Sequence, residues 1–323
     1  MTKGRKHQAA VSSEELLPLY ERMLLIRETE GRLSELFNDG QVPGFIHLSI
    51  GQEATCVGVC AALTREDTIA STHRGHGHCL AKGVEPVGLF QEILGHAEGL
   101  CGGRGGSLHV ADFSVGMLGA NGIVGAGIPI ALGSALAHKT LNSQRVAAAF
   151  FGDGALAEGV LYESLNLAAL WKLPLLFVCE NNGWSEFSPT SAAYVGHLGK
   201  LAESFGIPHH IVDGNNVEAV LTASRSDVEL LRTGSGPAVI ECMTLRVRGH
   251  YEGDPQKYRL AHRDRTVVDP LEFTRASMAA LGITDSEIGD IHERVRKQVA
   301  AAATTALAGS APHFDDALSG VYL

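Results

Sequence analysis

Two short polar segments of this chain, Gly152-Asp153-Gly154 and Asn181-Asn182, could together hold a charged ligand. Each follows a run of apolar residues, and a stretch with helical spacing lies between them. Either segment alone is typical of a turn. At the ends of neighbouring strands, however, they would present a carboxylate beside a carboxamide. Hard oxygen ligands of this kind, completed by phosphate oxygens, suit Mg²⁺, so the pair predicts a magnesium site.

The elements that must position this pair predict an α/β fold. Strand-like runs rich in Val, Ile, Leu or Phe alternate with Ala- and Leu-rich helical stretches, and the clearest runs are VAAAFF (146–151), LLFVCE (175–180), HHIVDG (209–214) and AVIECMTLRV (238–247). Continuous apolar strands separated by helices indicate a parallel sheet with helices on both faces. Ligands bind at the carboxyl ends of the strands in such sheets, which is where both polar segments fall.

Helices are expected at both ends of the chain. Ser12 to Asn38 has helical spacing and opens with a capping box formed by Ser12 and Glu15, and Pro18 is expected to kink its start. After Pro270 the chain becomes Ala-rich and helical again. The glycine-dense stretch Leu100 to Gly127 is the most loop-like long segment, and long loops of this kind are usually functional. We expect one domain spanning residues 1–323, with residues 1–11 as a flexible N-terminal tail.

Composition narrows the class of protein. A formal net charge of −10 argues against a nucleic-acid surface, which needs a basic face. No apolar run approaches the roughly 20 residues that span a bilayer, so we expect a cytoplasmic protein without a membrane segment. The six cysteines are scattered and are expected to be buried thiols. A diphosphate ligand would need a metal ion, an arginine or oriented N–H groups to counter the negative net charge locally.

Other ligand-binding and catalytic motifs have less support in the sequence. His73, His76 and His78 could share a transition-metal ion, although no carboxylate or cysteine completes their spacing. A dinucleotide fingerprint is missing, because Gly125-Ala126-Gly127-Ile128-Pro129 lacks the third glycine and has a proline where the helix should begin. The G-x-S-x-G elbow of serine hydrolases is missing too.

The spacing of the two polar segments is similar to the thiamine-diphosphate motif, in which Gly-Asp-Gly is followed by Asn-Asn. Further segments, in consistent order over roughly residues 15 to 270, resemble the E1 α subunit of 2-oxoacid dehydrogenases: FIHLSIGQEA (45–54), HRGHG (73–77), GRGGSLH (103–109), NGIVG (121–125), ESLNLAALWKLP (163–174) and RGHYEGDP (248–255). Within that family, GHYEGDP (249–255) and EFSP (186–189) are most similar to acetoin dehydrogenase α subunits. The resemblance implies the thiamine-diphosphate-binding fold.

The resemblance also implies a magnesium and diphosphate site. Asp153, Asn182 and the backbone carbonyl of Trp184 would coordinate Mg²⁺. Trp184 stands where many relatives have tyrosine, and a carbonyl ligand is insensitive to that change. Arg74 and the N–H groups around Gly154 and Ala155 would bind the diphosphate, which would supply the local positive charge.

The remaining residues implied by the resemblance lie nearer the reacting end of the cofactor. Gly122 and Val124 would line its pyrimidine and linker side. His47 and His250 would face the cofactor and its reactive carbon, and an imidazole suits the proton steps. His73 replaces the tyrosine usual before the arginine, and we count it as a cofactor-binding candidate.

The implied activity is cleavage of acetoin or a pyruvate-like 2-oxo acid, with transfer of the two-carbon unit to lipoyl on an E2 protein. The cofactor supplies the carbanion, and the protein positions it and handles protons. The glutamate that activates the cofactor comes from a β subunit in this family, so we expect an α₂β₂ heterotetramer. Tyr251 occupies the position of the serine that mammalian relatives phosphorylate, so that form of control is not expected.

Two alternatives remain open at this stage. One is a subunit of a split transketolase-like or acyloin-forming thiamine enzyme, against which the ALWKLP and RGH segments favour the dehydrogenase family. The other is a non-catalytic scaffold subunit, against which the joint presence of Asp153, Asn182, Arg74, His47 and His250 argues. The substrate is open among acetoin, pyruvate, a branched 2-oxo acid and a biosynthetic ketone, because pocket selectivity can rest on about 1–3 kcal/mol.

Overall fold

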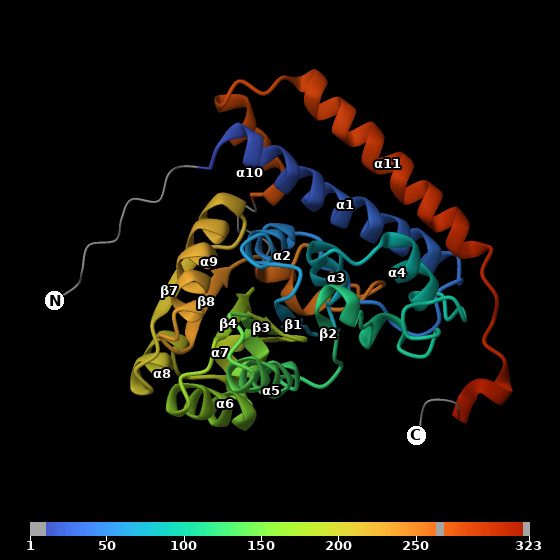
Figure 1. Cartoon of the computed structure of the whole chain (residues 1–323). Coiled ribbons are helices and arrows are strands. Elements are labelled where there is room, and N and C mark those ends of the chain that lie inside the picture. Colours follow the sequence, from blue (N-terminus) through green and yellow to red (C-terminus); the bar gives the residue numbers. More distant parts are fainter. Residues whose placement is uncertain (1–10, 263–267, 319–323) are drawn as a thin grey trace.

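A six-stranded parallel sheet forms the centre of the molecule in this computed structural model, which describes residues 11–262 and 268–318 (Figure 1). The strand order across the sheet is β2-β1-β3-β4-β8-β7. Its strands are β1 Thr68–Ala70, β2 Met117–Gly119, β3 Ala147–Gly152, β4 Leu175–Asn181, β7 His209–Asp213 and β8 Ala238–Met243. The predicted parallel α/β sheet is confirmed.

Helices cover both faces of this sheet, as continuous apolar strands require. The helices are α1 Ser13–Asn38, α2 Glu53–Cys60, α3 His76–Lys82, α4 Pro86–Ile93, α5 Gly127–Thr140, α6 Gly159–Leu170, α7 Thr190–Ala193, α8 Leu198–Ser204, α9 Val217–Arg232, α10 Pro270–Ala280 and α11 Asp285–Leu307. Residues of α5, α6 and α8 form one hydrophobic cluster with the sheet, and residues of α1–α4 and α9–α11 form the other. Because strand side chains alternate, Phe150 and Val178 enter the second cluster, whereas Phe151 and Phe177 enter the first.

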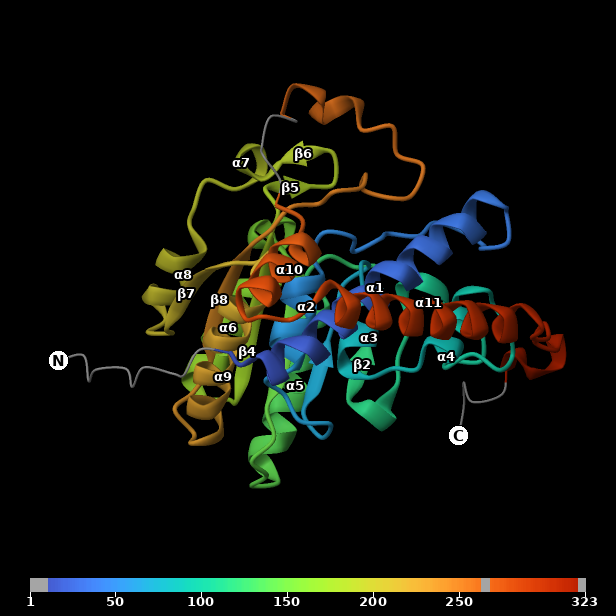
Figure 2. The same ribbon diagram turned by 90° about the horizontal axis from the view of Figure 1, so that it is seen from above.

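The pairing of β3 with β4 sets the position of the polar segments. Gly152 is level with Glu180 in the parallel register, so Asp153 and Asn182 follow the strands at the same edge of the sheet. A short hairpin, β5 Trp184–Ser185 with β6 Ser188–Pro189, then rises above that edge. Figure 2 shows this hairpin, α7 and the segment after β8 gathered on one side of the sheet.

The terminal helices agree with the sequence prediction. Helix α1 begins after the N-cap Ser12, whose side chain accepts the Glu15 N–H while the Glu15 carboxylate accepts the Ser12 N–H, so the capping box is confirmed. Residues 1–10 of the predicted tail 1–11 lie outside the described residues, and Val11 is buried in the core. Helix α11 lies along α1 (Figure 1).

Two boundaries differ from the prediction. The strand expected over 238–247 ends at Met243, because the chain after Thr244 leaves the sheet and its carbonyls are held by the Arg259 guanidinium, which donates to Arg246 and Arg248. The glycine-dense stretch also contains β2, which extends the sheet beside β1. Both differences arise from long-range backbone contacts that a local apolar pattern does not encode.

The cysteine and membrane expectations can also be compared with the structure. All six cysteines are free thiols, and five of them are buried. Across residues 11–262 and 268–318, no helix combines the length and the apolar character needed to cross a membrane.

Candidate functional site

A cavity of about 320 Å³ opens at the carboxyl ends of β3 and β4. Every residue that the sequence nominated lines this one cavity: His47, His73, Arg74, Gly122, Val124, Asp153, Gly154, Ala155, Asn182, Trp184 and His250. They come from segments that lie far apart in the chain. The fold therefore brings the predicted set together at the edge of the sheet where parallel α/β proteins bind ligands.

Asp153 is a buried acid that lines this cavity. Its side chain follows β3 and is 1% exposed, and burial raises the pKa of its carboxyl group. The Thr190 hydroxyl and the Asn182 N–H donate to its two oxygens, the latter at 3.3 Å, which offsets part of the shift. A divalent cation beside this carboxylate would instead favour its charged form. The donor chemistry and burial of Asp153 therefore fit a metal ligand.

The two asparagines after β4 have different surroundings. Asn182 is buried and lines the cavity, and its Oδ1 accepts the Trp184 N–H at 3.1 Å. Asn181 does not line the cavity, because its Nδ2 donates to Glu241 at 2.7 Å and its Oδ1 accepts the Gly183 N–H. Only Asn182 of the pair is thus placed to share a cation with Asp153.

Close backbone approach explains the glycine after Asp153. A Cβ built on Gly154 would lie 2.7 Å from the Ser185 Oγ. Because a side chain there would collide with the β5–β6 hairpin, glycine keeps the N–H groups of the turn Asp153–Ala157 close to the cavity.

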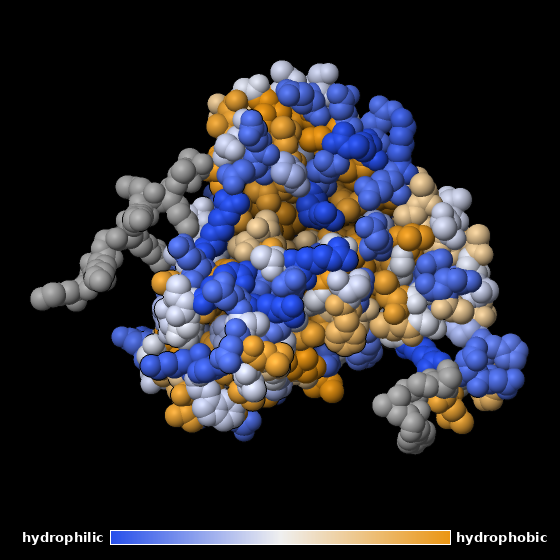
Figure 3. Space-filling view, viewed as in Figure 1, coloured by the Kyte–Doolittle hydropathy of each residue, from blue (hydrophilic) through white to orange (hydrophobic). Residues whose placement is uncertain are grey.

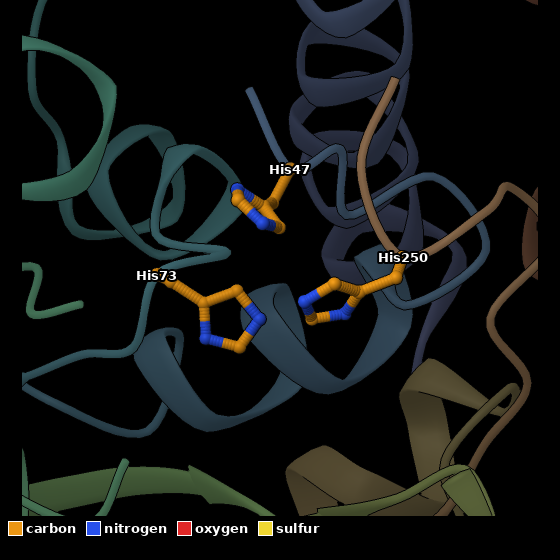
Figure 4. Close-up of side chains that lie close together, drawn as sticks. All are labelled: His47, His73 and His250. Carbon is orange, nitrogen blue, oxygen red and sulfur yellow. The ribbon is translucent and has the colours of Figure 1, made fainter. Parts of the chain in front are cut away.

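Three histidines that line the cavity converge on one another (Figure 4). The ring centroids of His47 lie 4.8 Å from His73 and 4.9 Å from His250, and those of His73 and His250 are 5.4 Å apart. Burial and the nearby Arg74 charge lower the pKa of His47 to about 3 and that of His250 to about 4, and lower the pKa of His73 well below its usual value. All three imidazoles are therefore neutral at pH 7.

Arg74 connects two of the chain segments that carry these histidines. Its buried guanidinium donates one N–H to the Leu48 carbonyl and another to the His250 carbonyl, the latter at 3.0 Å. Burial and the charge of Arg246 lower the pKa of Arg74 to about 10, so it is still a cation at pH 7. Arginine has five N–H donors, and these two bonds leave donors for a ligand.

A second network holds the His250 segment in place. Asp254 accepts the His250 N–H at 2.7 Å and the Tyr258 hydroxyl at 2.6 Å. Tyr258 in turn accepts from Arg246 at 2.8 Å, and Arg246 also donates to the Glu186 carbonyl at 3.0 Å. The position of the His250 ring is therefore set by its backbone and by neighbours on the hairpin.

Several polar residues that line the cavity were given no role from the sequence, among them Gln52, Glu180 and Arg246. The Gln52 Oε1 is buried without a hydrogen-bond partner in the part of the chain that the structure describes. Gln52 belongs to the FIHLSIGQEA segment, which marked it without assigning a role. Arg246 was missed because the apolar run around it predicted a continuing strand, whereas its 2%-exposed side chain turns into the cavity.

The alternative metal cluster of His73, His76 and His78 is wrong. His76 is bonded on both ring nitrogens, to Glu30 and to Ser107, each at 2.8 Å. His78 contacts Ser71 at 2.7 Å in a different part of the core. Helix α3 begins at His76 and directs these two side chains away from His73.

The neutral histidines predict an acid-sensitive fold. Unfolded histidines take up protons near pH 6.5, whereas folded His47 and His250 do so only near pH 3 and pH 4, so the unfolded state binds more protons between these limits. Stability should thus fall as pH drops from 6.5, by on the order of 2 kcal/mol per histidine at pH 5. Urea unfolding at pH 7 and pH 5 measures this loss.

Two variants test this prediction. The double variant His47→Asn/His250→Asn should lose less stability between the two pH values than the parent does. The control is His313→Asn, which removes a histidine whose side chain is 76% exposed and should behave like the parent. Identical pH dependence in the double variant and the parent would contradict the assignment.

The chain is similar to known proteins over most of its length. The family model described as "Dehydrogenase E1 component" matches residues 21–314. The chain is 43% identical over 325 residues to the α subunit of acetoin:2,6-dichlorophenolindophenol oxidoreductase from Bacillus subtilis, covering 99% of this chain and 97% of that protein. The protein of the same name from Cupriavidus necator is 45% identical, over 97% and 96% of the two chains. The pyruvate dehydrogenase E1 component α subunit of Zymomonas mobilis is 41% identical, over 93% and 85%. Since the family model and these relatives each span most of its length, the chain belongs to the dehydrogenase E1 component family.

Proposed function

We propose that this chain is the α subunit of a thiamine-diphosphate- and Mg²⁺-dependent dehydrogenase that cleaves acetoin or a pyruvate-like 2-oxo acid. The observation that carries the proposal is that one cavity joins the Asp153 and Asn182 oxygens to the His47 and His250 imidazoles. The first pair suits a diphosphate-bound metal ion, and the second suits proton transfer at a carbonyl.

The cation and diphosphate end of the cofactor would lie over β3 and β4. Asp153, Asn182 and the Trp184 carbonyl would hold Mg²⁺, with phosphate oxygens and water as its remaining ligands. The N–H groups of Gly154 and Ala155 and the remaining Arg74 donors would hold the diphosphate. This grouping would supply local positive charge in a chain whose net charge is −10.

The other end of the cavity would position the substrate. When bound, thiamine diphosphate supplies a nucleophilic carbon and an electron sink. Gly122 and Val124 would line its ring and linker, and His73 would lie beside its reacting end. The neutral His47 and His250 rings can each accept a proton at one nitrogen and donate one from the other, so they would move protons at the substrate oxygen.

Acetoin is the favoured substrate because the two relatives named for acetoin are 43% and 45% identical over nearly all of both chains. Pyruvate is the next candidate, since the Zymomonas mobilis relative is named for it at 41% identity. The two-carbon unit would then pass to lipoyl on an E2 protein, which is reduced as the unit is oxidised. In an assay without E2, a dye would accept these electrons instead.

An exposed apolar face is consistent with binding of a partner chain. Helices α5 and α6 and the residue directly after each helix leave large hydrophobic side chains exposed: Ile130, Leu136, Leu141, Tyr162, Leu170 and Trp171. Figure 3 shows hydrophobic surface among polar surface in the lower part of the molecule, where Figure 1 places these two helices. A face of this kind marks a protein interface. We infer that an E1 β subunit covers it in an α₂β₂ heterotetramer and contributes the glutamate that activates the cofactor.

The test uses the α chain co-expressed with an E1 β subunit. Calorimetry should show thiamine diphosphate binding that requires Mg²⁺, and acetoin should reduce a dye faster than pyruvate does. Transfer of the two-carbon unit to an aldose would favour the transketolase-like alternative. No cofactor binding by the complex would support a scaffold subunit.

A further inference from the structure

The three cavity histidines satisfy the geometry of a metal site of their own. One ring nitrogen from each of His47, His73 and His250 lies within 4.8 Å of the other two. Figure 4 shows the rings converging from three separate segments: the loop before α2, the loop after β1 and the segment after β8. Three imidazoles that face one another at this spacing can share one ion after small side-chain rotations.

One buried ring nitrogen of the cluster is also available for coordination. Metal binding uses the neutral form of imidazole. The Nδ1 of His47 is buried and has no hydrogen-bond partner within residues 11–262 and 268–318. A buried ring nitrogen without a partner is costly, and coordination would satisfy it.

The charges around the cluster act in both directions. Arg74 and Arg246 oppose a cation, although both guanidinia already donate to backbone carbonyls. On the other side, a Glu186 carboxylate oxygen lies 3.9 Å from the His250 Nε2, and Asp254 is close enough to favour positive charge on His250. Because the Glu186 side chain is 60% exposed, it can move to supply a fourth ligand.

One cavity therefore offers two sets of candidate cation ligands that differ in character. Asp153 and Asn182 offer oxygen, which Mg²⁺ prefers, whereas the histidine cluster offers nitrogen, which suits Zn²⁺, Cu²⁺ and Ni²⁺. Millimolar Mg²⁺ should compete poorly for the nitrogen site, and a low concentration of Zn²⁺ should leave the oxygen site to Mg²⁺.

We propose that His47, His73 and His250 form an inhibitory site for a borderline divalent transition-metal ion of the Zn²⁺ class. Three imidazole ligands with one position left to water, substrate or Glu186 match the usual coordination of zinc at an open site. The bound ion occupies the nitrogens that would otherwise exchange protons with the ketone, so it stops turnover without displacing the Mg²⁺-held diphosphate. Binding of the ion stands on geometry alone, and only the inhibition rests on the proposed function.

The first test is spectroscopic and uses the α/β complex without cofactor. One equivalent of Zn²⁺ is added in the presence of excess Mg²⁺, and X-ray absorption should show three imidazole ligands with Zn–N distances of about 2.0–2.1 Å. An all-oxygen shell, or an imidazole count below three, would overturn the proposal. This measurement needs no variant and no turnover.

The second test removes one nitrogen. His73→Tyr introduces the residue usual at this position in the family that the sequence resembles, and the Zn²⁺ affinity, measured by competition with a chromophoric chelator, should fall at least about 100-fold. His313→Gln removes an exposed histidine instead and should leave the affinity unchanged. Equal Zn²⁺ affinity in His73→Tyr and the parent would also overturn the proposal.

The functional consequence is measured separately. Zn²⁺ should inhibit dye reduction by the parent complex in competition with the ketone, and a chelator should restore the rate, whereas His73→Tyr should need at least about 100-fold more Zn²⁺ for the same fractional inhibition. Calorimetry of thiamine diphosphate without Zn²⁺ tests the proposed function by itself. Cofactor binding without Zn²⁺ binding would contradict only the metal-site proposal. Zn²⁺ binding without cofactor binding would contradict only the cofactor assignment.

Discussion

Replacing Asp153 by asparagine is expected to weaken Mg²⁺-dependent binding of thiamine diphosphate by more than about 100-fold, since even the loss of an outer-shell partner of a metal costs 10- to 100-fold. Asp153 is a buried carboxylate that lines the cavity, and an amide keeps its shape while removing the charge that would hold a divalent cation. The measurement is calorimetric titration of the α/β complex with cofactor at several Mg²⁺ concentrations.

The asparagine pair offers a matched control for this experiment. Asn182→Ala removes a side chain that lines the cavity and should weaken cofactor binding, whereas Asn181→Ala removes one that is bonded to Glu241 outside it. Asn181→Ala should therefore bind the cofactor within a few-fold of the parent. Equal losses in the two variants would show that the pair acts through the fold and not as a ligand.

Replacing His250 by alanine should lower turnover by about 10²- to 10⁴-fold, the contribution typical of a positioned acid or base. Cofactor binding should change little. The reason is structural: Asp254 holds His250 through its backbone N–H, and Arg74 holds its carbonyl, so both bonds survive loss of the ring. Steady-state kinetics with acetoin, together with calorimetry of cofactor binding, separates the two effects. His47→Ala should behave in the same way.

Tyr251 is the control for the His250 experiment. It is the next residue in the same segment, and it packs on Phe45 without lining the cavity. Tyr251→Phe should retain turnover within a few-fold. If His250→Ala instead lost cofactor affinity as steeply as rate, its ring would be a cofactor ligand and not a proton carrier.

Much of this site was predictable because it depends on local patterns. A buried strand must end where polar and glycine residues begin, so the positions of Asp153 and Asn182 at the ends of β3 and β4 follow from the runs before them. The start of α1 follows from the capping box of Ser12 and Glu15, which satisfies N–H groups of the first turn.

Side-chain direction was less predictable. His73 and His76 are separated by only two residues, yet one faces the cavity and the other is bonded to Glu30 and Ser107 in the core. Their close spacing in the sequence suggested a shared ion. However, His73 lies in the loop before α3, whereas His76 is the first residue of the helix. Arg246 was likewise not identified, because it lies in an apolar run that predicted a strand over 238–247. In the structure, β8 ends at Met243, before Arg246.

The sequence by itself determined that β3, β4, β7 and β8 are strands of a parallel sheet, that helices stand at both ends of the chain, and which residues follow β3 and β4, because apolar periodicity and caps act over short distances in the chain. Only the tertiary structure decided that His47, His73 and His250 meet, that Asn182 faces the cavity while Asn181 turns to Glu241, and that Arg74 joins two loops through their carbonyls. The physical reason is that burial, ion pairs and buried hydrogen bonds couple residues far apart in sequence. Such contacts exist only once the sheet and its covering helices have packed.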